Sequence, residues 1–152
     1  MKSLSDSREA AALVARVRRI RPDSARLWGR MTAPQMVCHL SDSFRAVMGL
    51  HAVSPASNAF SRTVMRFVAL HVPLTWPHGV PTRPEVDQEA GGTPPDVFAR
   101  DLEDLAALIA RFTAPRRDFQ PQPHPTFGPL SDAEWSRWAY LHVDHHLRQF
   151  GL

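Results

Sequence analysis

The prolines of this chain gather in two stretches, and this distribution limits what the chain can fold into. Of its 14 prolines, six lie within residues 73–95 and five within residues 115–129. Proline removes a backbone donor and clashes with the preceding helical turn, so neither stretch suits a helix interior. Little of the remaining sequence alternates between apolar and polar residues as a strand would. We therefore expect helices separated by two long loops.

Five segments carry apolar residues at the spacing of amphipathic helices. They span residues 5–20, 33–50, 57–71, 96–113 and 132–150. Thr32 is a suitable N-cap for the second helix, with Pro34 in its first turn. The last helix is preceded by Ser131 with Glu134 three residues later, which is the pattern of a capping box. Four long amphipathic helices and one shorter helix predict an all-α bundle.

Size and composition narrow the class of protein. A chain of 152 residues is expected to form one domain, residues 1–152. The net charge of +3 is modest, and the arginines at the end of the first helix are expected to form a solvated face, so no nucleic-acid partner is predicted. Cys38 is the one cysteine, which excludes a disulfide framework. The lack of a membrane-length apolar run or a signal-peptide core predicts a cytoplasmic protein without a membrane partner.

Two histidines of the last predicted helix indicate a metal site. His142 and His146 are four residues apart, so they share one helix face, and that face is also the apolar one. Two buried imidazoles on one stripe can serve as ligands of a divalent metal ion. His39, near the core-facing side of the second helix, is the candidate third ligand. Three histidine ligands leave a position open, which is typical of catalytic sites. The alternative is a set of hydrogen-bonded core histidines without metal.

Other chemistry-bearing residues receive weaker interpretations. His145 is rotated about 100° from His146 on the helix, so we expect it to flank the site rather than bind the ion. Asp42 and Asp144 either orient a ligand imidazole or lie at the surface as ordinary charges. Histidines at helix ends and in loops are expected outside the site; these are His51, His71, His78 and His124. Val143 follows His142, where the His-Glu-x-x-His pattern of metalloproteases requires glutamate.

Three segments of the sequence resemble the DinB-like superfamily. They are LWGRMTAPQMVCHLSD at residues 27–42, FGPLSDAEW at residues 127–135 and LHVDHHLRQFG at residues 141–151. The closest resemblance is to a small branch with no established reaction. The resemblance implies a four-helix bundle of mirror up-and-down topology, with the helix at residues 57–71 inserted between the second and third bundle helices. It also implies a divalent metal ion, zinc or nickel, held at positions that match His39, His142 and His146.

The expected function follows from the histidines and the resemblance together. Some members of the superfamily are transferases or isomerases that use low-molecular-weight thiols, and several form homodimers. The leading hypothesis is a metal-dependent enzyme whose open metal position binds a small substrate, such as a thiol. The alternative is a non-catalytic binding or interaction protein on the same scaffold, with a structural metal or none. Neither the residues nor the resemblance identifies the substrate, the reaction or a general base.

Overall fold

The regular structure of the chain is entirely helical, as the proline distribution predicts. A computed structural model describes residues 1–152 and contains no strand, the nearest feature being an isolated bridge between His124 and Gly128. The helices are α1 (Ser7–Val17), α2 (Ala33–Val47), α3 (Arg66–His71), α4 (Phe98–Phe112) and α5 (Asp132–Gln149). A π-helical stretch, η1 (Ser61–Met65), leads into α3, and a 3-10 turn, η2 (Pro84–Val86), lies in the first proline-rich loop.

Side-chain caps fix where the helices begin. Asp6 caps α1 by accepting a hydrogen bond from the backbone N–H of Arg8 at 2.8 Å. Thr32 and Gln35 form a reciprocal capping box at the start of α2. The predicted capping box of α5 is confirmed, because the Glu134 carboxylate accepts from the Ser131 N–H at 2.9 Å. Each cap satisfies backbone donors that the first turn leaves free. The caps on α2 and α5 therefore set the register of the helices that carry the histidines.

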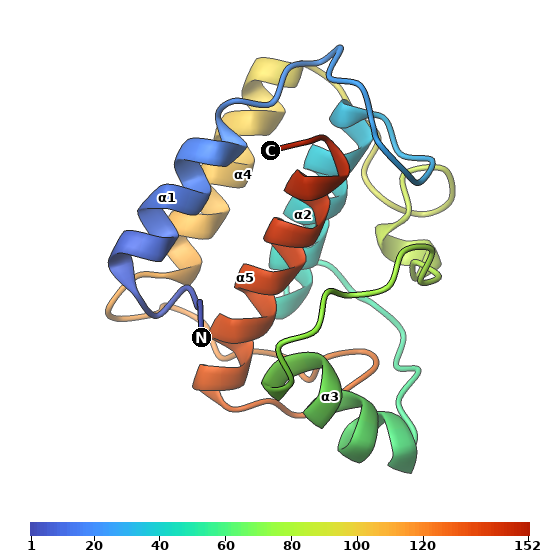
Figure 1. Ribbon diagram of the computed structural model, residues 1–152, viewed down its shortest axis with the longest axis vertical. Helices are drawn as coiled ribbons and strands as arrows, with labels where there is room; N and C mark the ends of the chain where they lie inside the picture. The colour runs from blue at the N-terminus through green and yellow to red at the C-terminus, as the bar shows by residue number, and fades with distance from the viewer.

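The four long helices lie side by side, as Figure 1 shows. α2 packs against α4, and α1 packs against both α4 and α5. This arrangement is compatible with a four-helix bundle. α3 lies apart from the other helices, near the first half of α5.

One hydrophobic core holds the long helices together. Its fully buried side chains include Leu13, Leu40, Phe44, Leu105, Ile109, Phe112, Trp135 and Leu147. Phe44 of α2 meets Phe112 of α4 edge to face, with ring centroids 5.4 Å apart. Each such side chain contributes about 1.5–3 kcal/mol on burial, and a chain of this length is expected to fold without a metal ion.

The apolar side of the segment at residues 57–71 is more exposed than its spacing suggests. Phe60, Val64 and Phe67 are each more than half exposed, and only Leu70 of α3 is fully buried. Helical periodicity identifies an apolar face but not what covers it. Here Phe60 and Val64 border a cleft instead of packing in the core. No helix of the structure combines the length and the apolar character needed to cross a membrane.

Candidate metal centre

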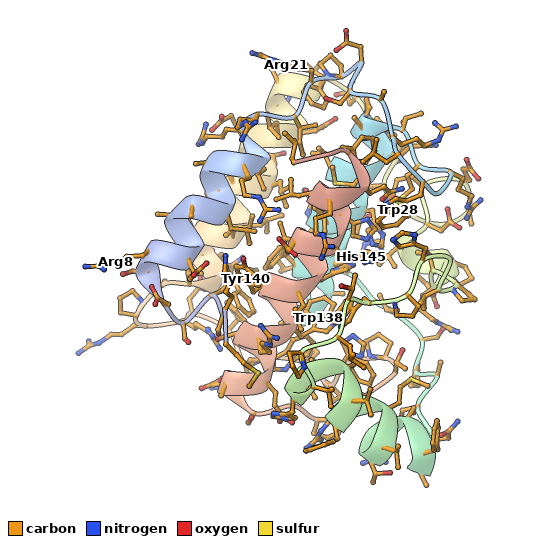
Figure 2. All side chains as sticks on the ribbon, viewed as in Figure 1. Arg8, Arg21, Trp28, Trp138, Tyr140 and His145 are labelled. Atoms are coloured by element: carbon orange, nitrogen blue, oxygen red, sulfur yellow. The ribbon has the colours of Figure 1, made fainter.

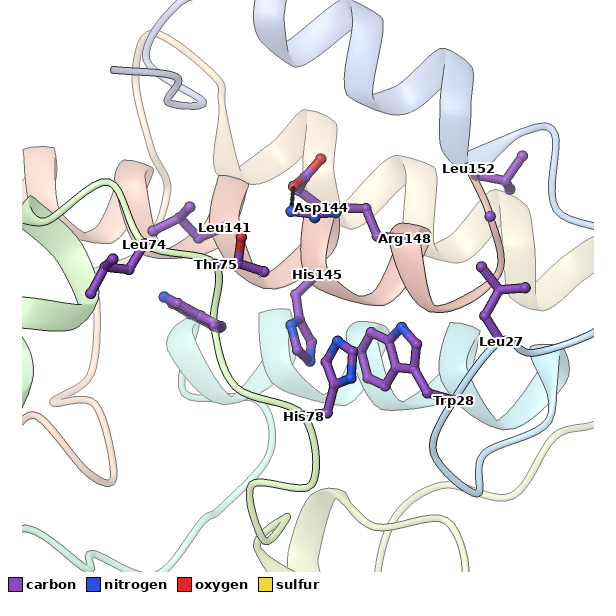
Figure 3. A pocket seen from close by; sticks show the side chains of 12 residues that line it. Leu27, Trp28, Leu74, Thr75, His78, Leu141, Asp144, His145, Arg148 and Leu152 are labelled. Carbon is purple, nitrogen blue, oxygen red and sulfur yellow. Dashed lines mark ion pairs between the residues drawn. The ribbon is translucent and has the colours of Figure 1, made fainter.

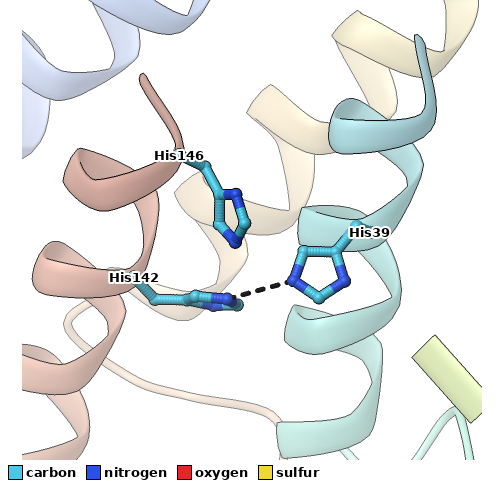
Figure 4. A group of neighbouring side chains, drawn as sticks. All are labelled: His39, His142 and His146. Carbon is cyan, nitrogen blue, oxygen red and sulfur yellow. Dashed lines mark hydrogen bonds between the residues drawn. The ribbon is translucent and has the colours of Figure 1, made fainter. Parts of the chain in front are cut away.

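The three histidines expected to bind metal come together between α2 and α5. His39 projects from α2 toward His142 and His146, which lie one turn apart on α5 (Figure 4). Each imidazole offers one nitrogen, and the three nitrogens lie within 4.8 Å of one another. We call His39, His142 and His146 the histidine triad.

The closest pair of triad atoms has nearly the separation that a shared metal ion requires. The Nε2 atoms of His39 and His142 are 3.1 Å apart. Two nitrogens bound to one tetrahedral zinc ion at 2.0–2.1 Å are about 3.3 Å apart. Imidazole nitrogens also suit nickel and copper. The donor set and its spacing therefore fit a divalent transition-metal ion.

A backbone carbonyl fixes the orientation of His39. The Nδ1 atom of His39 lies 2.7 Å from the carbonyl oxygen of Val86, at the end of η2. A carbonyl oxygen only accepts, so Nδ1 carries the proton and Nε2 presents its lone pair to the other histidines. This is the outer hydrogen bond that metal-binding histidines commonly make.

A glutamine fixes the orientation of His146 in the same way. The Nδ1 atom of His146 lies 3.0 Å from Oε1 of Gln149. The amide nitrogen of Gln149 donates to the carbonyl oxygen of Trp28 at 2.9 Å, which leaves Oε1 as the acceptor. His146 Nδ1 is therefore the donor, and its Nε2 is free to bind an ion. Gly29 allows the close approach, because a Cβ at this position would lie 2.5 Å from the Gln149 amide nitrogen.

His142 is held mainly by packing. Its ring lies 4.7 Å from Trp138, centroid to centroid, and no protein group bonds its Nδ1 atom. Because His39 Nε2 carries no proton, the metal-free state has His142 Nε2–H donating to it. Binding of an ion to both Nε2 atoms therefore requires the His142 proton to leave Nε2.

Burial keeps the triad uncharged. Removal from water lowers the pKa of His39 from its ordinary value. The pKa values of His142 and His146 are lowered further below the ordinary value, first by burial and then by neighbouring histidines. Metal ions bind neutral imidazole, so protons compete weakly for these three nitrogens.

The two aspartates considered as orienting residues have different surroundings. Asp42 is fully buried, and it acts on the triad through its charge, which favours the protonated form of His39, rather than through a hydrogen bond to an imidazole. It accepts hydrogen bonds from the backbone N–H and hydroxyl of Thr93 at 2.7 and 2.8 Å, and from Gln88 at 3.1 Å. Asp42 thus attaches the segment following η2 to α2. Asp144 instead pairs with Arg16 at 2.7 Å, on the side of α5 that faces α1.

His145 lies beside the triad without belonging to it, and its ring meets that of His146 edge to face at 5.2 Å. Figures 2 and 3 show its ring near Trp28. The ring centroids of His145 and Trp28 are 4.7 Å apart, and His78 stacks on Trp28 at 3.9 Å, with its own ring 6.2 Å from that of His145. Burial, followed by the nearby His78, lowers the pKa of His145 to about 4. These residues border a pocket of about 370 Å³.

A larger cleft, of about 1400 Å³, reaches the triad. Most of its exposed surface is apolar, and its walls come from α2, η1, α3, α5 and both proline-rich loops. The segment at residues 57–71 thus borders the same cleft as the triad. Aromatic and apolar side chains at the cleft include Trp28, Trp76, Trp138, Phe60, Val64 and Val68.

Sequence reasoning missed three contributors to this site. The Val86 carbonyl lies 47 residues from His39, and no local pattern indicates it. Gln149 follows His146 by three residues, so helical spacing alone places them on one face. His124 was expected outside the site because it lies in a proline-rich loop, but it lines the cleft. Its burial against Trp135 and Trp138 depends on how that loop folds back over α5.

Comparison with known proteins places the chain in a family but gives it no activity. No curated protein and no solved structure matches it. The sequence model of one family, described as a protein of unknown function (DUF1569), matches residues 3–151. Because this match covers nearly the whole chain, including the triad and the loops that orient it, the protein belongs to the DUF1569 family.

Proposed function

We propose that this protein is a metal-dependent enzyme with a DinB-like fold. The fold would be a single-domain four-helix bundle with the helix at residues 57–71 inserted after the second bundle helix. One observation carries the proposed function. Three neutral imidazoles converge at an apolar cleft, and hydrogen bonds to Val86 and Gln149 leave two of their Nε2 atoms free to bind an ion.

In this proposal each part of the site has a distinct task. His39, His142 and His146 hold a zinc or nickel ion, and a fourth position faces the cleft. The bound ion would lower the pKa of a thiol or water and so supply a nucleophile near neutral pH. The apolar walls exclude water and bind the body of a small organic substrate. The hydrogen bonds to His39 and His146 keep both rings oriented while substrate enters and leaves.

Metal stoichiometry of protein purified without a histidine tag tests the ligand set. We expect one zinc or nickel ion per chain after loading and dialysis, and loss of that ion in His39→Ala, His142→Ala and His146→Ala. His145→Ala is the matched control, because it removes an adjacent imidazole that is not part of the triad, and it should retain the ion. A wild-type protein that cannot be loaded would refute the proposal, and full retention by His39→Ala would refute this ligand set.

Thiol binding tests the open position. Adding 2-mercaptoethanol to the cobalt- or nickel-loaded protein should produce a thiolate-to-metal charge-transfer absorption band. The His145→Ala control should give the same band. A loaded protein that gives no band would contradict thiol access to the ion and would favour a structural metal in a non-catalytic protein.

A further inference from the structure

His124 has a fixed arrangement of its ring proton. It lies in the loop between α4 and α5, and its Nδ1 atom is 3.1 Å from the backbone nitrogens of both Thr126 and Phe127. A backbone N–H only donates, so Nδ1 must be the acceptor of both hydrogen bonds. The neutral ring therefore carries its proton on Nε2.

The surroundings of His124 keep the ring neutral. Its ring stacks on Phe127 at 4.6 Å and meets Trp138 at 5.1 Å, centroid to centroid. Burial lowers the pKa of His124 to about 3. At neutral pH the side chain is therefore an uncharged donor rather than a cation.

The Nε2–H group of His124 has no acceptor within the protein, although Nδ1 has two donors. His124 Nε2 is not one of the unpaired polar atoms that are closed to solvent, so it remains accessible to a water molecule or a ligand. The ring lines the same cleft as the triad. Trp138 packs against both rings, with its centroid 5.1 Å from that of His124 and 4.7 Å from that of His142. A molecule in this cleft can therefore reach the triad and His124 together across about one aromatic ring.

We propose that His124 is a binding residue of the cleft, whose Nε2–H donates a hydrogen bond to an uncharged acceptor, such as a carbonyl oxygen, on a mainly apolar ligand. This rests on the proposed function only in taking the cleft as a ligand site, and it does not require the metal. An uncharged acceptor is favoured over a carboxylate, because one neutral donor in apolar surroundings compensates poorly for the desolvation of a charge. The ligand class is thus an aromatic or aliphatic carbonyl compound.

A pair of fluorescent probes that differ in one acceptor tests this directly. They are 2-acetyl-6-(dimethylamino)naphthalene and its 2-ethyl analogue, each titrated into metal-free protein in the presence of a chelator. The measured quantity is the ratio of the two dissociation constants. We expect His124→Phe to reduce the preference for the acetyl probe about tenfold, since the carbonyl then loses its donor. His51→Phe is the matched control. It removes another cleft histidine whose Nε2 already bonds the Glu85 carbonyl, so the ratio should stay unchanged.

A purely structural role for His124 predicts a different result. His124→Phe would then weaken both probes equally and leave the ratio unchanged, which would overturn the inference. Should His124→Phe fail to fold, long-range ¹H–¹⁵N spectra of the wild type decide the matter. The His124 Nε2 proton should shift downfield with the acetyl probe and not with the ethyl probe. A proton found on Nδ1, or no shift, would also overturn it.

Failure of this inference is distinguishable from failure of the proposed metal centre. If neither probe binds the wild type, the cleft is not a site for such ligands and His124 has no binding role. One-to-one loading with zinc would still support the triad in that case. Conversely, a protein that binds the acetyl probe through His124 but holds no metal would retain this inference and lose the proposed enzyme.

Discussion

Asp42→Asn is the substitution whose effect on the metal centre the structure specifies most closely. Both carboxylate oxygens of Asp42 accept two hydrogen bonds. Oδ1 accepts from the Arg45 guanidinium at 3.1 Å and the Thr93 hydroxyl at 2.8 Å, while Oδ2 accepts from Gln88 at 3.1 Å and the Thr93 N–H at 2.7 Å. An amide has one NH2 group, so in either orientation that group faces two donors.

The expected loss is large because the site is closed to water. Asp42 is fully buried, and each buried donor that loses its acceptor costs about 1–3 kcal/mol. A domain of this kind has a total stability of about 5–15 kcal/mol, so Asp42→Asn should stay folded but with a much lower midpoint in urea. Releasing the segment after η2 should also loosen the Val86 carbonyl from His39. We expect zinc affinity to fall about 10–100-fold, as for other losses of outer hydrogen bonds.

Asp144→Asn is the matched control for this prediction. Asp144 lies between the two triad residues of α5 in sequence, but its ion pairs with Arg16 and Arg148 are partly exposed. Its loss should cost about 1 kcal/mol or less and leave zinc affinity unchanged. The assays are urea unfolding of the metal-free proteins and competitive zinc titration. Equal destabilisation by the two substitutions would refute the assignment of Asp42 as the loop anchor. Unchanged zinc affinity in a destabilised Asp42→Asn would refute its link to His39.

Three further outcomes are expected. Gly29→Ala should lower both stability and zinc affinity, because its Cβ would meet the Gln149 amide. Gly79→Ala, at a similar positive φ of 75° but with open space around it, should lower stability alone, by about 1–2 kcal/mol. In metal-free protein the pKa of His124 is lowered to about 3, so below the ordinary histidine pKa the unfolded chain binds a proton that the native chain does not. The unfolding free energy therefore falls as the pH is lowered from the ordinary histidine pKa toward about 3. His124→Phe should therefore show a shallower loss of unfolding free energy than wild type between pH 6 and pH 4 in urea titrations, by up to about 1.4 kcal/mol per pH unit. Chelation should leave the helical circular dichroism intact at 25 °C, and zinc at a hundred times its dissociation constant should add about 2.7 kcal/mol to the unfolding free energy.

The helices and the α5 pair of histidines could be predicted because local sequence determines them. Capping residues act within four positions, and the spacing of His142 and His146 places them on one face of any helix that includes both. His39 needed one further assumption, that the core-facing sides of α2 and α5 meet. The same local reasoning extended α1 to residue 20, whereas the helix ends at Val17. Ile20 is nonetheless buried, so its apolar character indicated packing rather than helix.

The groups that orient the histidines could not be predicted, because loops bring them from distant parts of the chain. Asp42 and Asp144 are alike in sequence, each an aspartate within three residues of a triad histidine. Only the fold of the loop that carries Gln88 and Thr93 makes Asp42 a buried anchor and leaves Asp144 at the α1 side of α5. Periodicity could not assign the apolar side of residues 57–71 either, since a cleft wall and a core face have the same spacing.

The three triad imidazoles are not restrained equally, because two of them have hydrogen bonds to groups outside the triad and the third has none. The Val86 carbonyl restrains His39, and the Gln149 side chain restrains His146, each through the Nδ1 atom. His142 has no hydrogen-bond partner outside the triad and rests against Trp138, which also packs against His124 and Trp135. The least restrained triad imidazole, His142, thus packs against the same indole, Trp138, as His124 does. A ligand that accepts from His124 would lie near Trp138, beside the triad residue that has the fewest restraints. Two rigid imidazoles would then keep an ion in place while the third accommodates what binds beside it.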